Sequence, residues 1–261
     1  KKQQDLKTAT KVYVNLAEPE LASKISAYPV DGIGLLRAEF IIAHIGKHPK
    51  KFIEEGKGKE FTDRLADDIA SFCKAFYPRP VLYRATDFKT NEYKSLIGGK
   101  EYEPEEANPM LGYRGAYRYI HDKRVFELEL AAIKKVREKM GLTNLRLMIP
   151  FVRTVKDLAL VKKVIYDAGL KRSHTFKLFM MVEIPSNVIL IDDFINEGID
   201  GISIGSNDLT MLTLGVDRDN QEVESEFDEQ NKAMLWSFER VIKAAREHGI
   251  ESGMCGQAPS E

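Results

Sequence analysis

Short apolar stretches alternate with longer amphipathic ones along almost the whole chain, and this alternation limits the folds open to it. Seven stretches of four to nine residues are rich in apolar side chains and read as strands. Strands that alternate with helices are typical of βαβ units and a parallel sheet. The predicted strands are residues 11–16, 32–40, 80–86, 145–152, 177–185, 201–204 and 251–257; the predicted helices are one that begins at Pro19 and residues 61–76, 123–140, 154–168, 187–197 and 228–248.

This alternation, in a chain of 261 residues, predicts an α/β fold of the TIM-type (β/α)8 barrel class. Such a barrel contains eight βα units, but Glu261 follows almost directly after the seventh predicted strand. We therefore expect residues 11–261 to form one barrel domain, truncated after the seventh strand and lacking the last βα unit. Residues 1–10 are expected to be a linker or the end of a preceding helix. The open edges should leave a gap between the first and seventh strands, or be filled by another chain.

Two polar stretches depart from the alternation. Residues 44–60 are rich in Lys, Glu and Gly and are expected to be a solvated excursion. Residues 87–109 form a long polar loop after the third predicted strand. Because loops longer than about 15 residues in a compact domain are usually functional, this loop is a candidate part of a site.

The composition is that of a globular protein, with 43% hydrophobic and 30% charged residues. The net charge of −1 gives no electrostatic reason to expect a nucleic acid or an anionic membrane as partner. No apolar run approaches the ~20 residues of a membrane span, and no signal peptide opens the chain. The two cysteines lack metal-site spacing, so a cytoplasmic location is expected.

Two predicted strands each deliver a carboxylate at their carboxyl ends. Glu183 lies near the end of residues 177–185, and Asp208 follows residues 201–204 after a Gly-Ser-Asn turn. In a parallel barrel these strand ends share one mouth, where catalytic residues lie. Two hard oxygen ligands there suit Mg²⁺, which takes few protein ligands and keeps sites for water and substrate. The alternative is two ordinary loop carboxylates.

Arginines lie near the ends of two other predicted strands. Arg37 is close to the end of the second strand and Arg84 to the end of the third. Guanidinium groups bind phosphate or carboxylate with two parallel hydrogen bonds and stay charged. Arg114 and Arg218 are weaker candidates for binding the same substrate groups. The alternative for the first pair is a surface ion pair, and for the second pair a role in fixing a loop through carboxylates.

Cys255 lies close to the end of the seventh predicted strand, between Met254 and Gly256. A thiol has a reference pKa of about 8.5, so it holds a proton that it can donate at neutral pH. The alternative is an inert small hydrophobic residue, which is our expectation for Cys73. No histidine lies at a predicted strand end, and all five are expected to be structural or solvated: His44, His48, His121, His174 and His248.

Several of these stretches resemble the PEP/pyruvate-binding C-terminal barrel of the PEP-utilising enzymes. They are GIGLLRAEF, VEIPS, SIGSNDLTMLTLGVDRD and GMCGQ, in the order found in that family. RATDFKTNEYKSLIGG, YEPEEANPMLGYRG and CGQAPS are most similar to its phosphoenolpyruvate synthase branch. The resemblance covers about residues 11–260 and implies a TIM-type barrel that binds pyruvate and PEP.

The resemblance also implies roles for individual residues. Glu183 and Asp208 match the Mg²⁺ ligands of the family, and Arg37 and Arg84 match the arginines that hold the phosphoryl group and carboxylate of the substrate. Gly205, Ser206 and Asn207 match the substrate-contacting loop. Cys255 matches the acid/base that exchanges a proton with the substrate methylene carbon.

The chemistry implied is phosphoryl transfer between a phosphohistidine and the enolate of pyruvate, with Mg²⁺ stabilising the enolate. In the family a swivelling domain carries the phosphohistidine, flanked by Gly-Gly and Thr-Ser/Cys-His-Ala, and no histidine here has those neighbours. We therefore expect the phosphohistidine and ATP-binding domains in other parts of a larger enzyme. The oligomeric state is left open, with a homodimer as one option.

Two other functions fit the same residues. A Mg²⁺-dependent pyruvate-type aldolase or lyase would also place Glu, Asp and Arg around an enolate, but it has no need of Cys255. A non-catalytic platform for ligand binding and dimerisation would bind pyruvate without exchanging its methyl protons. Retro-aldol activity without a phosphohistidine partner would favour the aldolase, and binding without exchange would favour the platform.

Overall fold

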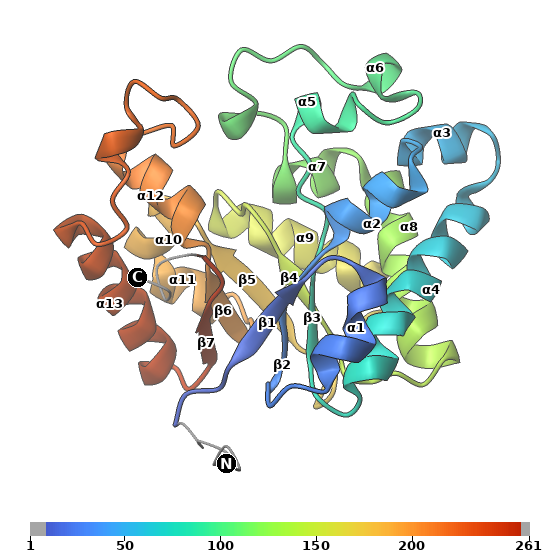
Figure 1. Cartoon of the computed structure of the whole chain (residues 1–261), viewed down its shortest axis with the longest axis horizontal. Coiled ribbons are helices and arrows are strands. Elements are labelled where there is room, and N and C mark those ends of the chain that lie inside the picture. The colour runs from blue at the N-terminus through green and yellow to red at the C-terminus, as the bar shows by residue number, and fades with distance from the viewer. Residues whose placement is uncertain (1–8, 257–261) are drawn as a thin grey trace.

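The strands form a single parallel sheet with helices packed around its outer face, as the computed structural model shows for residues 9–256 (Figure 1). Strand order follows chain order, and each neighbouring pair is parallel. All seven predicted strands are present, and the predicted TIM-type α/β class is confirmed. The strands are β1 (Tyr13–Leu16), β2 (Gly32–Arg37), β3 (Val81–Arg84), β4 (Leu145–Ile149), β5 (Leu178–Val182), β6 (Gly201–Ile204) and β7 (Glu251–Met254).

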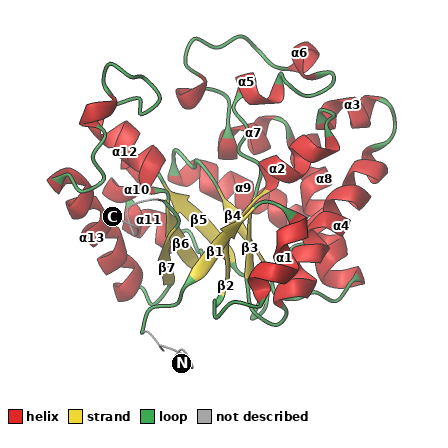
Figure 2. Cartoon of the chain, in the orientation of Figure 1, coloured by secondary structure: helices red, strands yellow, loops and turns green. Residues whose placement is uncertain are grey.

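The helices occupy the intervals between strands, so that the sheet lies inside and the helices outside (Figure 2). Short 3-10 turns at Pro109–Leu111 and Glu224–Glu226 and a π-helical turn at Lys135–Lys139 add to them. The helices are α1 (Pro19–Ser26), α2 (Ala38–Ile45), α3 (Pro49–Glu54), α4 (Gly58–Phe76), α5 (Thr90–Tyr93), α6 (Gly99–Tyr102), α7 (Gly115–His121), α8 (Lys123–Lys134), α9 (Val155–Asp167), α10 (Pro185–Ile189), α11 (Ile191–Asn196), α12 (Ser206–Leu214) and α13 (Lys232–Glu247).

Within residues 9–256 no hydrogen-bonded ladder joins β1 to β7, so the predicted gap between the first and last strands is present. The Asn15 side chain donates a hydrogen bond to the Cys255 carbonyl across this opening at 3.2 Å. Residues 251–253 of β7 are exposed, as expected for an unpaired edge. Residues 1–8, predicted as most of a linker, and residues 257–261 lie outside the described residues.

The prediction of a solvated excursion at residues 44–60 was wrong. Pro49 begins α3, which the His48 ring caps by accepting a hydrogen bond from the Lys50 amide. Phe52 is buried against Phe61 of α4. The lysines and glutamates that suggested a solvated loop lie on the outer surface, while one aromatic side chain anchors the segment to the core.

The predicted strand over residues 32–40 is also corrected, because it ends at Arg37 and α2 begins at Ala38. The predicted helix over 187–197 is divided between α10 and α11 at Leu190. The single helix expected over 123–140 ends in the π-helical turn. Among residues 9–256, no helix has the length and apolar character needed to cross a membrane.

The core has two layers of apolar side chains. The larger layer packs the helices against the outer face of the sheet; along α4, for example, it includes Phe61, Leu65 and Ile69 at helical spacing. A smaller cluster fills the inner face of the sheet, against which Cys255 packs. Its members are Leu35, Leu82, Met148, Phe179 and Met181.

Candidate active site

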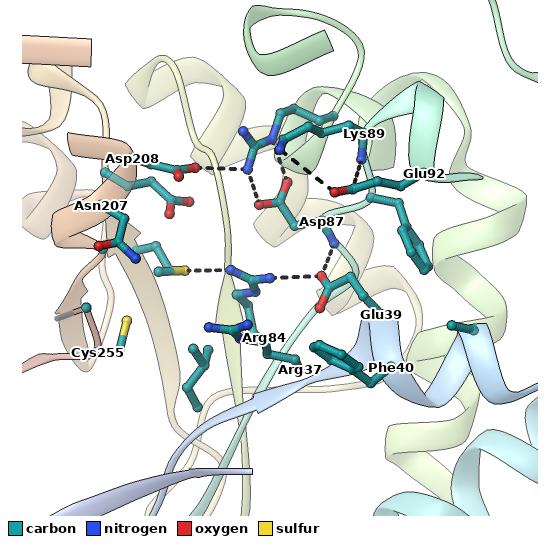
Figure 3. A pocket seen from close by; sticks show the side chains of 18 of the residues that line it. Arg37, Glu39, Phe40, Arg84, Asp87, Lys89, Glu92, Asn207, Asp208 and Cys255 are labelled. Carbon is teal, nitrogen blue, oxygen red and sulfur yellow. Dashed lines mark hydrogen bonds and ion pairs between the residues drawn. The ribbon is translucent and has the colours of Figure 1, made fainter. Parts of the chain in front are cut away.

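A cavity of about 370 Å³ opens at the carboxyl ends of the strands, the position expected for the site of a parallel barrel (Figure 3). Of the site residues predicted from the sequence, Ser206 is the one that does not line this cavity. Ser206 is fully buried, and its hydroxyl lies where any side chain on Gly256 would collide with it. The selected residues that line the cavity are Arg37, Arg84, Arg114, Glu183, Gly205, Asn207, Asp208, Arg218 and Cys255.

Sheet register brings the two strand-end arginines together. Arg37 of β2 and Arg84 of β3 are direct partners in the parallel ladder, so their side chains leave the sheet side by side. Arg84 forms an ion pair with Glu39 at 3.1 Å and donates a hydrogen bond to the Met181 sulfur at 3.8 Å (Figure 3). Burial lowers the pKa of Arg84, but the carboxylates of Glu39 and Asp87 outweigh it and raise that pKa, so the guanidinium is always charged.

Glu183 is buried at the end of β5, with 2% of its surface exposed. One carboxylate oxygen accepts a hydrogen bond from the Phe151 amide at 2.6 Å, and Phe151 has the positive φ of 47° that non-glycine residues seldom adopt. Burial, and then the nearby charges of Asp208 and Asp87, raise the pKa of Glu183 to about 8. The raised pKa therefore reflects mainly the removal of this carboxyl group from water.

Asp208 lies in the first turn of α12, not in the loop expected from its Gly-Ser-Asn context. Its carboxylate pairs with Arg114 at 3.0 Å. Asn207, one residue earlier, lines the same cavity. With its side-chain amide turned over, Asn207 accepts a hydrogen bond from Arg218 at 2.9 Å and donates one to the buried Glu229 at 3.2 Å.

Arg114 bridges two carboxylates from different parts of the chain. It binds Asp87 through two hydrogen bonds, at 3.0 and 2.5 Å, in addition to Asp208. Its guanidinium lies 3.9 Å from the centre of the Phe151 ring. Arg114 is therefore buried and paired, which is the loop-fixing arrangement that the sequence left open as an alternative. Arg218 has 39% of its side chain exposed and lies 3.9 Å from Asp219.

Charged residues that line the cavity but were not named from the sequence are Glu39, Asp87, Lys89 and Glu92. Asp87 comes three residues after the end of β3, so the rule that selected Glu183, a carboxylate near a strand end, would have found it. Glu39 lay inside a predicted strand, and no sequence signal marked it. Its carboxylate accepts a hydrogen bond from the Asp87 amide and forms an ion pair with Arg84, and so fixes both relative to α2.

Cys255 follows β7 and faces the cavity. Its amide and its thiol both donate to the Ile204 carbonyl, at 3.1 and 3.5 Å. Burial raises the pKa of the Cys255 thiol, so the sulfur keeps its proton at neutral pH. The cavity is thus lined by a protonated thiol as well as by the guanidinium groups of Arg37 and Arg84, which come from other strands of the same sheet (Figure 3).

The candidate metal ligands have the chemistry that Mg²⁺ requires. Glu183 and Asp208 offer hard carboxylate oxygens, and a cation beside them would favour the charged form of Glu183 against the effects of burial and of the Asp208 charge, which raise its pKa. In the described part of the chain, no group of three or more His, Cys, Asp or Glu side chains is arranged to hold a metal.

Of the five histidines, none lines the cavity. His48 is buried and shares the Glu103 carboxylate with Arg118. His121 and His248 make surface contacts with the Tyr117 carbonyl and Asp192.

Comparison with known proteins identifies the family. The family model "PEP-utilising enzyme, PEP-binding domain" matches residues 1–261. A probable phosphoenolpyruvate synthase from Staphylothermus marinus is 52% identical over 97% of this chain and 31% of its own length. The phosphoenolpyruvate synthase of Aeropyrum pernix is 50% identical, over 97% of this chain and 32% of its own length. The phosphoenolpyruvate synthase of Helicobacter pylori is 44% identical, over 97% of this chain and 34% of its own length.

Solved structures agree on the fold. An HpcH/HpaI aldolase/citrate lyase family protein from Burkholderia cenocepacia aligns with a TM-score of 0.54 at 12% identity, covering 93% of this chain and 77% of its own. The citrate synthase SbnG aligns with a TM-score of 0.52 at 14% identity, covering 94% of this chain and 77% of its own. At such identities the likeness extends to the fold alone. The chain spans about a third of the length of its curated relatives, and with the family model matched over its whole length it belongs to the PEP-utilising enzymes, as a member of their PEP-binding domain.

Proposed function

We propose that this chain is the PEP- and pyruvate-binding domain of a pyruvate, water dikinase of the phosphoenolpyruvate synthase type. The observation that carries the proposal is the convergence of paired arginines, two carboxylates and a protonated thiol on one cavity. Arginines suit a phosphoryl group and a carboxylate, and the carboxylates suit Mg²⁺. The parent enzyme would convert ATP, pyruvate and water to AMP, PEP and phosphate, and it would use further domains for the phosphohistidine and for ATP.

In this proposal each residue has a separate task. Mg²⁺, held by Glu183 and Asp208, would supply positive charge to the carboxylate and keto oxygens of pyruvate and so favour its enolate. Arg37 and Arg84 bind the phosphoryl group and neutralise the charge spread over its oxygens during transfer. Their permanent charge and fixed position require no reorganisation at that moment.

Cys255 handles the proton of the reacting carbon. Toward PEP, the thiolate form of Cys255 accepts a methyl proton of pyruvate and becomes the thiol, and the enolate oxygen then takes the phosphoryl group from phosphohistidine. In the reverse direction the phosphoryl group leaves first, and the Cys255 thiol gives its proton to the methylene carbon. A raised thiol pKa fits this second role, because the proton is present at neutral pH.

The relatives support the wider setting. This chain covers about a third of their length, so we assign the phosphohistidine and ATP-binding steps to other domains of the parent chain. We also propose a cytoplasmic location, in keeping with free cysteines at positions 73 and 255.

The test is calorimetric binding of oxalate, a mimic of the pyruvate enolate, with and without Mg²⁺. Asp208→Ala should abolish Mg²⁺-dependent binding, because one remaining carboxylate cannot fix the octahedral ion. Asp200→Ala is the matched control: Asp200 is also paired with an arginine, Arg172, but it precedes β6 at the opposite end of the sheet. Unchanged oxalate binding in Asp208→Ala would contradict the metal assignment.

A further inference from the structure

Beneath the charged residues of the cavity lies a layer of apolar side chains on the same strands. Leu35 precedes Arg37 by two residues, and Met181 precedes Glu183 by two. Because side chains alternate between the faces of a strand, residues two apart point to the same side. Both therefore face the inside of the sheet, one step below the charged layer, and both belong to the inner apolar cluster.

Leu35 and Met181 are the members of this cluster that also line the cavity, within the described residues. Each is 2% exposed, and Met148 of the same cluster is fully buried. Met181 is held from two further sides, since its sulfur lies 3.8 Å from Arg84 and its terminal methyl lies 2.9 Å from where a Cβ on Gly205 would be. The cavity thus has an apolar floor of buried side chains, of which Met181 is closely held.

Cys255 packs against this floor. Under the proposed function, the carbon that exchanges a proton with the thiol must lie in contact with the sulfur, and hence directly over the floor. We propose that Leu35 and Met181 determine substrate specificity by limiting the chain length of the 2-oxo acid. A methyl group at the reacting carbon is accepted, and an ethyl group is rejected by collision with Leu35 and Met181.

The size of the effect follows from packing. Forcing one extra methylene into a filled apolar site costs about 1–3 kcal/mol, which corresponds to roughly 10–100-fold in a dissociation constant. Leu35 is the better residue to change, because Met181 also contacts Arg84 and can bend to fit a larger group. Leu35→Ala removes three carbon atoms from the floor, more than the added methylene needs.

The experiment measures Mg²⁺-dependent binding of pyruvate and of 2-oxobutyrate to this chain by calorimetry. The wild type should bind pyruvate roughly 10–100-fold more tightly. In Leu35→Ala this preference should fall at least about tenfold, chiefly through tighter 2-oxobutyrate binding. Leu82→Ala is the matched control, because Leu82 belongs to the same cluster but does not line the cavity. Its preference should equal that of the wild type.

Each outcome has a separate meaning. If the wild type binds no pyruvate, the proposed function falls and this inference with it. If the wild type binds pyruvate but Leu35→Ala keeps the full preference, the floor does not set specificity and only this inference is overturned. An equal loss of preference in Leu82→Ala would overturn it too, by showing a general loosening of the cluster. Should Leu35→Ala fail to fold, Leu35→Val tests the same floor, with a smaller fall in preference expected and an unchanged preference overturning the inference.

Discussion

Two buried groups of arginines and carboxylates differ in how completely they are paired. The pocket cluster leaves polar atoms without hydrogen-bond partners among residues 9–256, namely Glu39 Oε2 and Arg84 Nε. In the loop cluster, both Glu103 oxygens accept from Arg118 at 2.7 Å, and one also contacts His48 at 2.9 Å. The pocket cluster comprises Glu39, Arg84, Asp87, Arg114 and Asp208; the loop cluster comprises His48, Glu103 and Arg118.

This difference in pairing suggests different roles for the two clusters, ligand binding for the pocket cluster and fold stability for the loop cluster. Buried polar groups are normally paired, and those that are not call for a specific explanation. The loop cluster ties the long loop after β3 to the segment between α2 and α3, with aromatic rings of Tyr93 and Tyr102 packed on His48. The pocket cluster instead lines the cavity and leaves two of its buried polar atoms unpaired. We therefore expect changes in the pocket to affect chemistry, and changes in the loop cluster to affect folding.

The largest effect is expected at Cys255. Cys255→Ala removes the proton carrier but leaves the arginines and carboxylates in place. Deuterium exchange into the methyl group of pyruvate should fall about 10²–10⁴-fold, as is usual for a lost general acid, while binding of PEP and Mg²⁺ persists. Proton NMR measures the exchange, with the phosphohistidine domain supplied in trans.

Cys73→Ala is the control for this prediction, since Cys73 is buried in α4 away from the cavity. It should exchange at the wild-type rate. Wild-type exchange in Cys255→Ala would instead make Cys255 an ordinary core residue.

The next effect concerns the loop cluster. Glu103→Ala leaves Arg118 buried without its carboxylate, which typically costs about 3–5 kcal/mol of unfolding free energy. Urea unfolding followed by circular dichroism measures this loss, and oxalate binding by the folded protein should be retained. The control is Glu101→Ala in the same loop, where the pair with Lys51 is screened by solvent and should contribute little to stability. Equal losses in the two variants would show that burial of the cluster contributes nothing.

The smallest effect tests whether a cation decides the charge of a buried carboxylate. Glu103, beside Arg118 and His48, has a lowered pKa despite burial. Burial raises the pKa of Glu129 to about 7; its partners are the Tyr83 hydroxyl and the amide and hydroxyl of Thr86, all neutral. At a pH between 4.5, the ordinary pKa of a glutamate, and about 7, Glu129 keeps its proton in the folded protein and releases it in the unfolded chain.

Glu129 therefore makes the protein less stable as pH rises through this window, by up to about 3 kcal/mol. Glu129→Gln removes the titrating group and should remove its part of the fall, because the amide oxygen can accept the same hydrogen bonds. The measurement is the unfolding free energy of both proteins at pH 5 and pH 7, and the difference between them isolates Glu129 from other groups. Parallel curves for the two proteins would rule out a raised pKa.

Much of the site could be predicted because parallel strands end at a common edge. Glu183 and Arg84 were selected as polar residues at the ends of apolar stretches, and both line the cavity. Asp87 satisfies the same rule and was overlooked. Glu39 was out of reach, since GIGLLRAEF reads as one continuous strand although the helix begins at Ala38. His48 was expected in a solvated segment for a different reason, because the charged residues around it conceal that one side of the segment is buried.

The sequence by itself determined the seven βα steps, the TIM-type class and which residues end the strands, because alternation and periodicity are local properties of the chain. Only the tertiary structure decided which of those residues touch. The register of β2 with β3 sets Arg37 beside Arg84, and Arg114 reaches Asp87 and Asp208 across 27 and 94 positions of the chain. Contacts between distant residues, and the burial that shifts the pKa of Glu183, depend on the packing of the whole sheet and are not encoded in any one segment.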